Sequence, residues 1–337
     1  MSDRAWRPGA VTGIGSLPGT DPEDAARLIF GELPDLPHLA ELPARGAGAD
    51  MIGRTAALLV DLPVEIVPSG WRLTAHAGQE LRRARDFLAW DLDALEAAAD
   101  GYAGPVKVQA AGPWTLAASL ELASGHRVVS DHGAARDLAE SLTDGLRTHL
   151  DDVRARVPGA TPVLQLDEPS LPAVLAGAVP TPSGYGTVRA VESVVVEDAL
   201  RTVLGAAPAG SRVVHSCAAD VPLGVLRAAG ADAISLDASR LGAAHYDALG
   251  EAVDAGVSLW LGVLPAVAAA VSFDAARARI RELWGGLGFP LAQLADAVVA
   301  TPACGMAGAS PEHARAVLKA LRELGKWLTE AEADAIP

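Results

Sequence analysis

Residues 212–237, RVVHSCAADVPLGVLRAAGADAISLD, contain the unit that decides the fold. Residues 212–217 and 233–237 are apolar runs too short for helices, which predicts two buried parallel strands. Residues 222–229 between them have the pattern of an amphipathic helix. A strand, a helix and a second strand in this order form the unit from which parallel α/β sheets are built.

The same unit recurs along the chain of 337 residues. Further strands are expected at residues 10–16, 106–112, 161–167, 258–262 and 297–304, and further helices at 81–99, 134–157, 246–255, 274–286 and 311–324. Seven or eight such units in one undivided chain predict an α/β fold, the (β/α)8 TIM barrel, as a single domain over residues 1–337. A doubly wound sheet is the alternative, because periodicity alone cannot show that a sheet closes on itself.

Charge and cysteine content narrow the class of protein. Lys and Arg number 27 against 42 Asp and Glu, a formal net charge of −15, so nucleic acid and anionic membrane surfaces are poor candidates for partners. No stretch resembles a secretory signal or a membrane-spanning helix. With only two cysteines, a disulfide framework is not expected. We therefore expect a cytoplasmic protein whose thiols stay reduced.

Polar side chains fall where the expected strands end. These residues are Ser16, Asp167, His215, Cys217, Asp237 and Cys304. In a barrel the carboxyl ends of all strands form one face, and active sites assemble on that face. Residues far apart in sequence are therefore expected to meet there.

Three of these residues suggest a metal site. His215 and Cys217 lie two apart and so point to the same side of a strand end, and Cys304 follows the last expected strand. One nitrogen and two sulfur ligands suit zinc, with Asp237 as the best-placed fourth ligand. A substrate thiol bound to zinc is deprotonated and becomes a nucleophile. The alternative is that each cysteine is a small buried hydrophobe and the histidine an ordinary surface or core residue.

At these residues the sequence resembles the C-terminal catalytic barrel of cobalamin-independent methionine synthases. The resemblance covers nearly the whole chain and rests on the order and spacing of IGSLP at 14–18, GPWT at 112–115, QLDEP at 165–169, HSC at 215–217, DAISLDASR at 232–240 and PACG at 302–305. It implies a zinc-dependent methyltransferase with the metal on His215, Cys217 and Cys304. Asp237 stands where the family has a glutamate ligand.

The resemblance also implies a homocysteine site. Ile14 and Ser16 match the stretch that holds the substrate carboxylate, and Asp167 and Glu41 match the two carboxylates that hold its amino group. A buried ammonium needs such carboxylate partners. Each residue also has a purely structural interpretation, since Ser16 could cap a helix and Asp167 could accept from loop amides.

Two departures from the family bear on the methyl donor. The chain lacks the additional N-terminal half that helps to bind polyglutamylated folate, and residues 261–268, LGVLPAVA, lack the family's catalytic histidine. We therefore predict a methylcorrinoid such as methylcobalamin, free or on a corrinoid protein, as the donor to homocysteine. The alternatives are alkyl transfer to another small thiol similar to coenzyme M, and a non-catalytic barrel that binds a thiol or metal.

Overall fold

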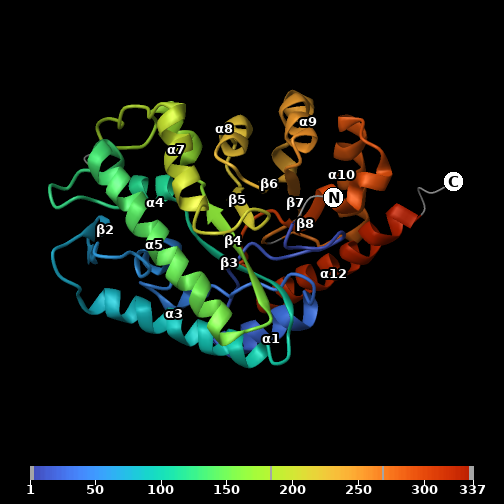
Figure 1. Cartoon of the computed structure of the whole chain (residues 1–337), viewed down its shortest axis with the longest axis horizontal. Helices are drawn as coiled ribbons and strands as arrows, with labels where there is room; N and C mark the ends of the chain where they lie inside the picture. Colours follow the sequence, from blue (N-terminus) through green and yellow to red (C-terminus); the bar gives the residue numbers. More distant parts are fainter. Residues whose placement is uncertain (1–3, 183, 268, 334–337) are drawn as a thin grey trace.

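The computed structural model describes residues 4–182, 184–267 and 269–333. Its main sheet has six strands, all parallel, in the spatial order in which they follow along the chain. They are β3 (Gly104–Ala111), β4 (Ala160–Asp167), β5 (Arg212–Ser216), β6 (Ala233–Asp237), β7 (Ser258–Leu264) and β8 (Val298–Pro302). The sheet curls, and helices lie along its outer side (Figure 1). The strands expected over residues 106–304 are all present.

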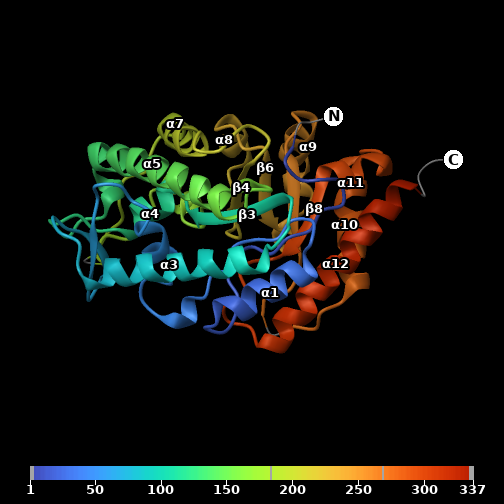
Figure 2. The ribbon, with the colours of Figure 1, turned by 60° about the horizontal axis from the view of Figure 1, so that its bottom comes forward.

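Eight helices surround the sheet, each in contact with the next, and the last contacts the first. In order around the ring they are α1 (Pro22–Glu32), α3 (Gln79–Ala98), α5 (His132–Arg156), α7 (Ser193–Leu204), α8 (Leu223–Ala228), α9 (Tyr246–Asp254), α10 (Phe273–Leu287) and α12 (Pro311–Ala333). Figure 2 shows α12 packing beside α1, so helices from opposite ends of the chain complete the ring. A closed ring of helices is the outer layer expected of a barrel.

Local sequence explains where two of these helices begin. The Asp21 side chain accepts from the backbone N–H groups of Glu23 and Asp24, with Pro22 in the first helical position of α1. The Ser310 hydroxyl accepts from the backbone N–H of His313 in the first turn of α12, and Pro311 opens that helix. Both starts combine a polar N-cap with a proline that has no N–H to satisfy.

Several short elements did not follow from periodicity. They are the antiparallel hairpin of β1 (Val64–Val67) and β2 (Gly70–Leu73), and the helices α2 (Met51–Ala56), α4 (Pro113–Ser119), α6 (Leu171–Ala176) and α11 (Leu294–Ala297). Helix α7 was also not expected. Most of these elements span only four to seven residues. A segment that short shows less than two helical turns of pattern, so its periodicity is ambiguous.

Two N-terminal segments, one containing Val11 and Ser16 and the other containing His38 and Glu41, lie between β8 and β3. A barrel would need its first two strands at this place. Val11 forms a parallel bridge with Ala300 of β8, and His38 forms one with Lys107 of β3. A third parallel bridge joins Ser16 to Glu41, so the two segments also contact each other. Each segment makes single bridges and not a continuous ladder. The expected strand at residues 10–16 is therefore not formed as a strand, and the fold is confirmed as α/β with a six-stranded curled sheet.

Glycines explain why these segments do not form regular strands. A Cβ on Gly13 would lie 2.3 Å from the His38 imidazole, and one on Gly15 would lie 2.9 Å from the Gln109 side chain. The backbone here passes over inward-pointing side chains at a distance that only glycine permits. Where the backbone lies this close to those side chains, it forms isolated bridges in place of a continuous strand ladder.

The inner face of the sheet has an apolar end and a polar end. Near the amino ends of the strands, Val163, Val213 and Ala233 pack with Trp6 and Trp260, whose rings meet edge to face with centroids 5.1 Å apart. Side chains two residues further along each strand point to the same inner face. These include Gln165, His215 and Ser235, so the interior becomes polar toward the carboxyl ends of the strands.

Candidate active site

Strand register brings three polar residues into one row. Asp167 at the end of β4 pairs with His215 of β5, and His215 pairs with Ser235 of β6. All three are buried. Adjacent strands lie about 4.8 Å apart, so side chains in one row of the inner face are direct neighbours. The His215 Nδ1 atom lies 2.9 Å from Ser235 Oγ, within hydrogen-bond distance.

His215, Cys217 and Cys304 meet at this end of the sheet. One donor atom from each lies within 4.8 Å of the others, and the two Sγ atoms are 2.9 Å apart without a disulfide. The Nε2 atom of His215 is buried and has no hydrogen-bond partner among the residues that the structure describes. A buried imidazole nitrogen without a partner is costly unless something else occupies its lone pair. A soft N/S donor set with one unused nitrogen is what zinc coordination requires, so these residues fit the metal.

The two thiols perturb each other. Their hydrogen bond lowers the pKa of Cys217 to about 7 and raises the pKa of Cys304, which burial raises further. Of the two thiols, Cys217 is therefore the one that ionises more readily. A bound cation stabilises thiolates, so it would release the remaining proton from Cys304.

Asp237 is not brought into this group of donors. Its Oδ1 accepts from the Ser239 N–H at 2.9 Å and from the Ser239 hydroxyl at 2.7 Å. Its Oδ2 lies 3.3 Å from Nε of Arg240. The carboxylate instead opens the short 3-10 helix Ala238–Arg240 as its N-cap.

The four residues expected to bind the substrate are brought together beside the metal group. Ser16 bridges to Glu41, and its carbonyl accepts from the Met306 N–H at 2.8 Å, two residues after Cys304. A Cβ on Gly305 would lie 2.2 Å from Ser16 Oγ, so Ser16 sits directly against the loop that carries Cys304.

Ile14 and Asp167 are linked through buried side chains. The Ile14 carbonyl accepts from Lys107 Nζ at 2.8 Å and from Gln165 Nε2 at 2.9 Å. Gln165 Nε2 also donates to Asp167 Oδ1 at 2.7 Å. One backbone carbonyl of the Ile-Gly-Ser stretch is therefore fixed by side chains from β3 and β4.

We call Glu41, Lys107, Gln109, Gln165 and Asp167 the interior polar cluster. Lys107 is fully buried and donates to Gln109 Oε1 at 3.1 Å in addition to Ile14. Burial lowers the pKa of Lys107 to about 7, with Asp167 and Glu41 opposing. Burial raises the pKa of Glu41 to about 7, opposed by Arg54 at 3.6 Å and reinforced by Asp167. Burial also raises the pKa of Asp167, while His215 and Lys107 oppose the shift.

The cluster holds more carboxylate than ammonium. Two acids face one buried lysine, and the nearby Arg54 is shared with Asp91. Ionising both acids in a low-dielectric interior is expensive without a further cation. The site is therefore electrostatically complementary to a ligand that brings one positive charge.

Sequence reasoning missed Lys107, Gln109, Gln165 and Ser235. A signal was present, because GPVKVQAA over residues 104–111 places a cation and an amide at alternate positions of an otherwise apolar strand. Alternate positions share one face, so both had to point into the same interior. Glu168 has a structural role instead. Its carboxylate accepts from the N–H groups of Trp114 and Thr115 and from the Thr115 hydroxyl, and so caps α4.

Comparison with known proteins agrees with this arrangement. The family model described as cobalamin-independent synthase, catalytic domain, matches residues 10–326. No curated protein matches the chain by sequence. No helix among the described residues is long and apolar enough to span a membrane, and the cytoplasmic location stays a prediction.

A solved structure supports the fold. A B12-independent methionine synthase from Shewanella sp. W3-18-1 matches with a TM-score of 0.63 and 15% identity, over 98% of this chain and 100% of that chain. At that identity the likeness concerns the fold alone. GH5_18 proteins from Bifidobacterium longum subsp. infantis and Streptomyces cattleya have TM-scores of 0.47 and 0.48, with 11% and 14% identity. The match to the Bifidobacterium protein covers 94% of this chain and 79% of that protein. The match to the Streptomyces protein covers 96% of this chain and 81% of that protein.

The family match corrects the predicted methyl donor. Cobalamin-independent synthases take the methyl group from a folate, methyltetrahydropteroyltriglutamate, so the predicted methylcorrinoid donor and corrinoid protein partner are wrong. The prediction relied on the missing N-terminal half and on the missing histidine in residues 261–268, of which Ala268 lies outside the described residues. His313 of α12 contacts this loop, with its Nε2 2.9 Å from the Pro265 carbonyl.

The predicted class of enzyme is confirmed. Members of the matched family are zinc-dependent methyltransferases that act on homocysteine. The match spans nearly all of the described residues, and the expected His and two Cys donors converge on one face of the sheet. On this basis the chain belongs to the cobalamin-independent synthase family, as a catalytic domain of that family.

Proposed function

We propose that this chain transfers the methyl group of a methyltetrahydrofolate to the sulfur of homocysteine, giving methionine. The observation that carries the proposal is the convergence of His215, Cys217 and Cys304, with donor atoms within 4.8 Å of one another. In the transfer a carbon–sulfur bond forms as the carbon–nitrogen bond of the folate breaks. The thiol gives up its proton and the folate nitrogen gains one.

His215 Nε2 and the two cysteine sulfurs would hold the zinc. What zinc supplies is positive charge that keeps a coordinated thiol deprotonated at neutral pH. Ser235 would orient the imidazole by accepting from Nδ1, which leaves Nε2 with its lone pair. Asp237 is the candidate fourth ligand, and it would have to exchange its bonds to Ser239 and Arg240 for that role.

The interior polar cluster would recognise the amino acid part of the substrate. Glu41 and Asp167 are buried acids whose pKa values are raised, and a substrate ammonium between them would favour their ionised forms. Ser16 and the fixed backbone at Ile14 lie beside the Cys304 loop, where the substrate carboxylate would bind. The two acids favour an amino acid thiol over a sulfonate thiol, which brings no cation.

We also propose that the whole chain is one catalytic domain built as a closed eight-stranded barrel. The segments that bridge β8 to β3 through Val11 and His38 would fill the first two strand positions. The closed ring of eight helices supports this, since a (β/α)8 barrel has one helix outside each strand.

The test is methyl transfer by the purified chain loaded with zinc, supplied with homocysteine and 5-methyltetrahydropteroyltriglutamate. We expect methionine to form, and His215→Gln to abolish both zinc binding and methionine formation. His76→Gln is the matched control, because His76 is exposed and outside the donor group. Stoichiometric zinc without any methionine from the folate would contradict the proposal.

The role of Asp237 is tested separately by zinc affinity. As a ligand, Asp237 would make Asp237→Asn weaken zinc binding to a degree comparable with Cys304→Ser. An affinity equal to that of the unmodified chain would limit the metal set to His215, Cys217 and Cys304.

A further inference from the structure

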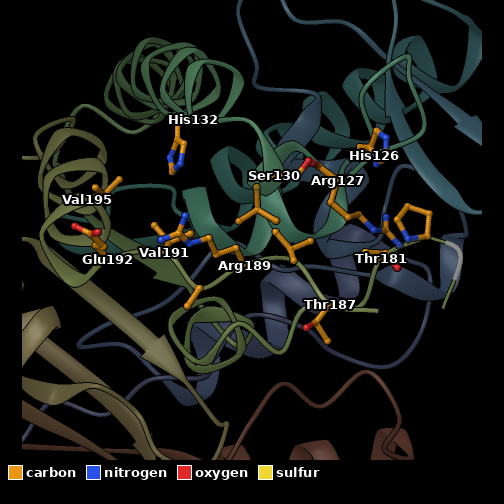
Figure 3. A pocket seen from close by; sticks show the side chains of 14 residues that line it. His126, Arg127, Ser130, His132, Thr181, Thr187, Arg189, Val191, Glu192 and Val195 are labelled. Atoms are coloured by element: carbon orange, nitrogen blue, oxygen red, sulfur yellow. The ribbon is translucent and has the colours of Figure 1, made fainter. Parts of the chain in front are cut away.

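The chain has arginines in two contrasting settings. Arg127 and Arg189 line an open cavity of about 800 Å³ between the loops that lead into α5 and α7 (Figure 3). Arg45 and Arg54 are instead buried, with only 6% and 4% of their side chains exposed. Charges in an open cavity are screened by water, whereas buried charges act strongly on their neighbours. Arg54, which lies 3.6 Å from Glu41, is therefore placed to influence the interior polar cluster.

Asp91 on α3 binds both buried arginines, and its own side chain has no exposed surface. Arg45 Nη1 lies 2.8 Å from Asp91 Oδ1, and Arg45 Nη2 donates to Asp91 Oδ2 at 2.9 Å. Arg54 Nη1 donates to the same Oδ2. The guanidinium carbon of Arg45 also lies 4.7 Å from the centroid of the Phe87 ring. Asp91 is therefore fixed in place by two cations.

The orientation of Arg54 is set by Asp91 and not by Glu41. Arg54 Nε lies 3.6 Å from Glu41 Oε1, close enough for an ion pair but too far for a hydrogen bond. Arg54 Nη2 is buried and has no hydrogen-bond partner among the described residues. The guanidinium thus has a spare N–H group and still makes no hydrogen bond to the nearby acid. His149 of α5 also lies near Arg54, but burial lowers the pKa of His149 to about 3, so it adds no charge at neutral pH.

This arrangement leaves the Glu41 carboxylate for another cation. Burial raises the pKa of Glu41 to about 7 even though Arg54 opposes the shift, so the arginine only partly compensates the charge of the acid. A guanidinium that was free to turn would form a bidentate pair with a buried carboxylate, which is the strongest geometry for these two groups. A substrate ammonium would then have to displace the arginine. Asp91 opposes that pairing by binding Nη1 of Arg54.

We infer that Asp91 is a positioning residue for substrate specificity, because it holds Arg54 away from Glu41 and so keeps this carboxylate available for the ammonium group of an amino acid thiol. In the proposed function, on which this inference rests, Glu41 binds the amino group of homocysteine. Loss of the Asp91 charge should then weaken binding of the ammonium and leave binding of the thiol and carboxylate unaffected. A general disturbance of the site would instead weaken binding of thiols with and without an amino group alike.

The experiment compares two thiols that differ only in the amino group, homocysteine and 4-mercaptobutyrate. Titration calorimetry on the full zinc-loaded chain gives the Kd for 4-mercaptobutyrate divided by the Kd for homocysteine. We expect Asp91→Asn to lower this ratio about 10-fold, roughly the value of one hydrogen bond to a charged group, through weaker binding of homocysteine alone. Asp93→Asn is the matched control and should leave the ratio unchanged, because Asp93 is on the same helix but is exposed and pairs with Arg156.

The double variant Asp91→Asn/Arg54→Met tests whether Asp91 acts through Arg54. Without Arg54 there is no guanidinium to pair with Glu41, so we expect the ratio to return to within about 2-fold of its value in the unmodified chain. Arg54→Met alone leaves Asp91 paired with Arg45, and an undiminished ratio in this variant would support the inference. A lower ratio would show that Arg54 assists Glu41 and would overturn it, even where Asp91→Asn does not fold. Urea unfolding shows which variants are folded.

The remaining outcomes separate this inference from the proposed function. A ratio that Asp91→Asn leaves unchanged would overturn the inference, as would equally weakened binding of both thiols. A ratio that stays low in the double variant would also overturn it, since Arg54 would then not be the cause. Failure of the unmodified, zinc-loaded chain to bind homocysteine would instead refute the proposed function.

Discussion

The imidazole of His215 and the hydroxyl of Ser235 lie 2.9 Å apart on adjacent strands, deep in the sheet and away from solvent. This contact involves Nδ1, and it leaves the buried Nε2 without any partner among the described residues. A ligating histidine is generally held by a hydrogen bond at its other nitrogen, which fixes both tautomer and ring orientation. If His215 holds the proposed zinc, Ser235 would orient its imidazole without touching the metal.

Removing the Ser235 hydroxyl should lower the zinc affinity of the proposed metal site. We expect Ser235→Ala to lower zinc affinity about 10-fold, because loss of an outer hydrogen bond to a ligand costs roughly that much. Competition with a chromogenic chelator measures the affinity. Ser239→Ala serves as the control, since Ser239 bonds to Asp237 and not to His215. Equal affinity in Ser235→Ala and the unmodified chain would mean that the imidazole is oriented by packing alone.

Lys107 should support both stability and substrate binding. Lys107→Met removes the donor to the Ile14 carbonyl and the cation beside Glu41 and Asp167. Breaking such a buried charge arrangement costs about 3 kcal/mol of unfolding free energy. We also expect the KM for homocysteine to rise about 10-fold, or about 1.4 kcal/mol, because the Ile14–Ser16 backbone loses its anchor. Urea unfolding and steady-state kinetics measure the two effects.

Lys319→Met is the control for this substitution, because Lys319 is exposed on α12 and has no partner in the interior polar cluster. A stable Lys107→Met variant with an unchanged KM would show that Lys107 only fills space. A variant that is destabilised but has an unchanged KM would limit its role to folding.

A single methyl group at Gly305 should disturb the contact between the Cys304 loop and Ser16. The new Cβ of Gly305→Ala would lie 2.2 Å from Ser16 Oγ, so either the Ser16 hydroxyl must rotate away or one of the two segments must move. Such overpacking costs about 1–3 kcal/mol, and the shift should weaken both zinc and homocysteine binding. Gly308→Ala is matched to it in the same loop, because its Cβ would meet Val267 at an ordinary 3.6 Å. Binding equally tight in both variants would show that the loop adapts without cost.

Glu41 should make stability depend on pH. Burial raises its pKa from 4.5 to about 7, so the folded chain holds a proton that the unfolded chain has already lost. Between these two values the ionisation of Glu41 lowers the unfolding free energy as pH rises. Glu41→Gln mimics the protonated acid and removes this loss. Its stability relative to the unmodified chain should therefore increase from pH 5 to pH 8, as measured by urea unfolding without ligand.

Glu140→Gln, at an exposed position on α5, is the control for general charge effects. A constant difference between Glu41→Gln and the unmodified chain across this pH range would contradict a raised pKa at Glu41. In that case Arg54 and Lys107 would be keeping the acid ionised throughout.

The order of strands and helices could be predicted from the sequence, because the hydrophobic pattern repeats several times within each long element. Helix α5 was expected at 134–157 and spans His132–Arg156, and β6 was expected at 233–237 and spans those residues. The N-terminal part was harder. Residues 10–16 look like a strand by composition, yet their glycines pass so close to His38 and Gln109 that only isolated bridges form. Distant side chains decide that outcome, and no local pattern records them.

The sequence by itself determined the α/β class and the kind of chemistry and named three candidate metal donors, because periodicity and ligand type are local properties of the chain. It named His215, Cys217 and Cys304, and the structure brings their donor atoms together. Only the tertiary structure decided the second layer of the site: Ser235 behind His215, and Lys107 between Ile14 and the two acids. It also turned Asp237 toward Ser239 and Arg240. Hydrogen-bond partners across strands depend on register and burial, which arise only when residues far apart in the chain are packed together.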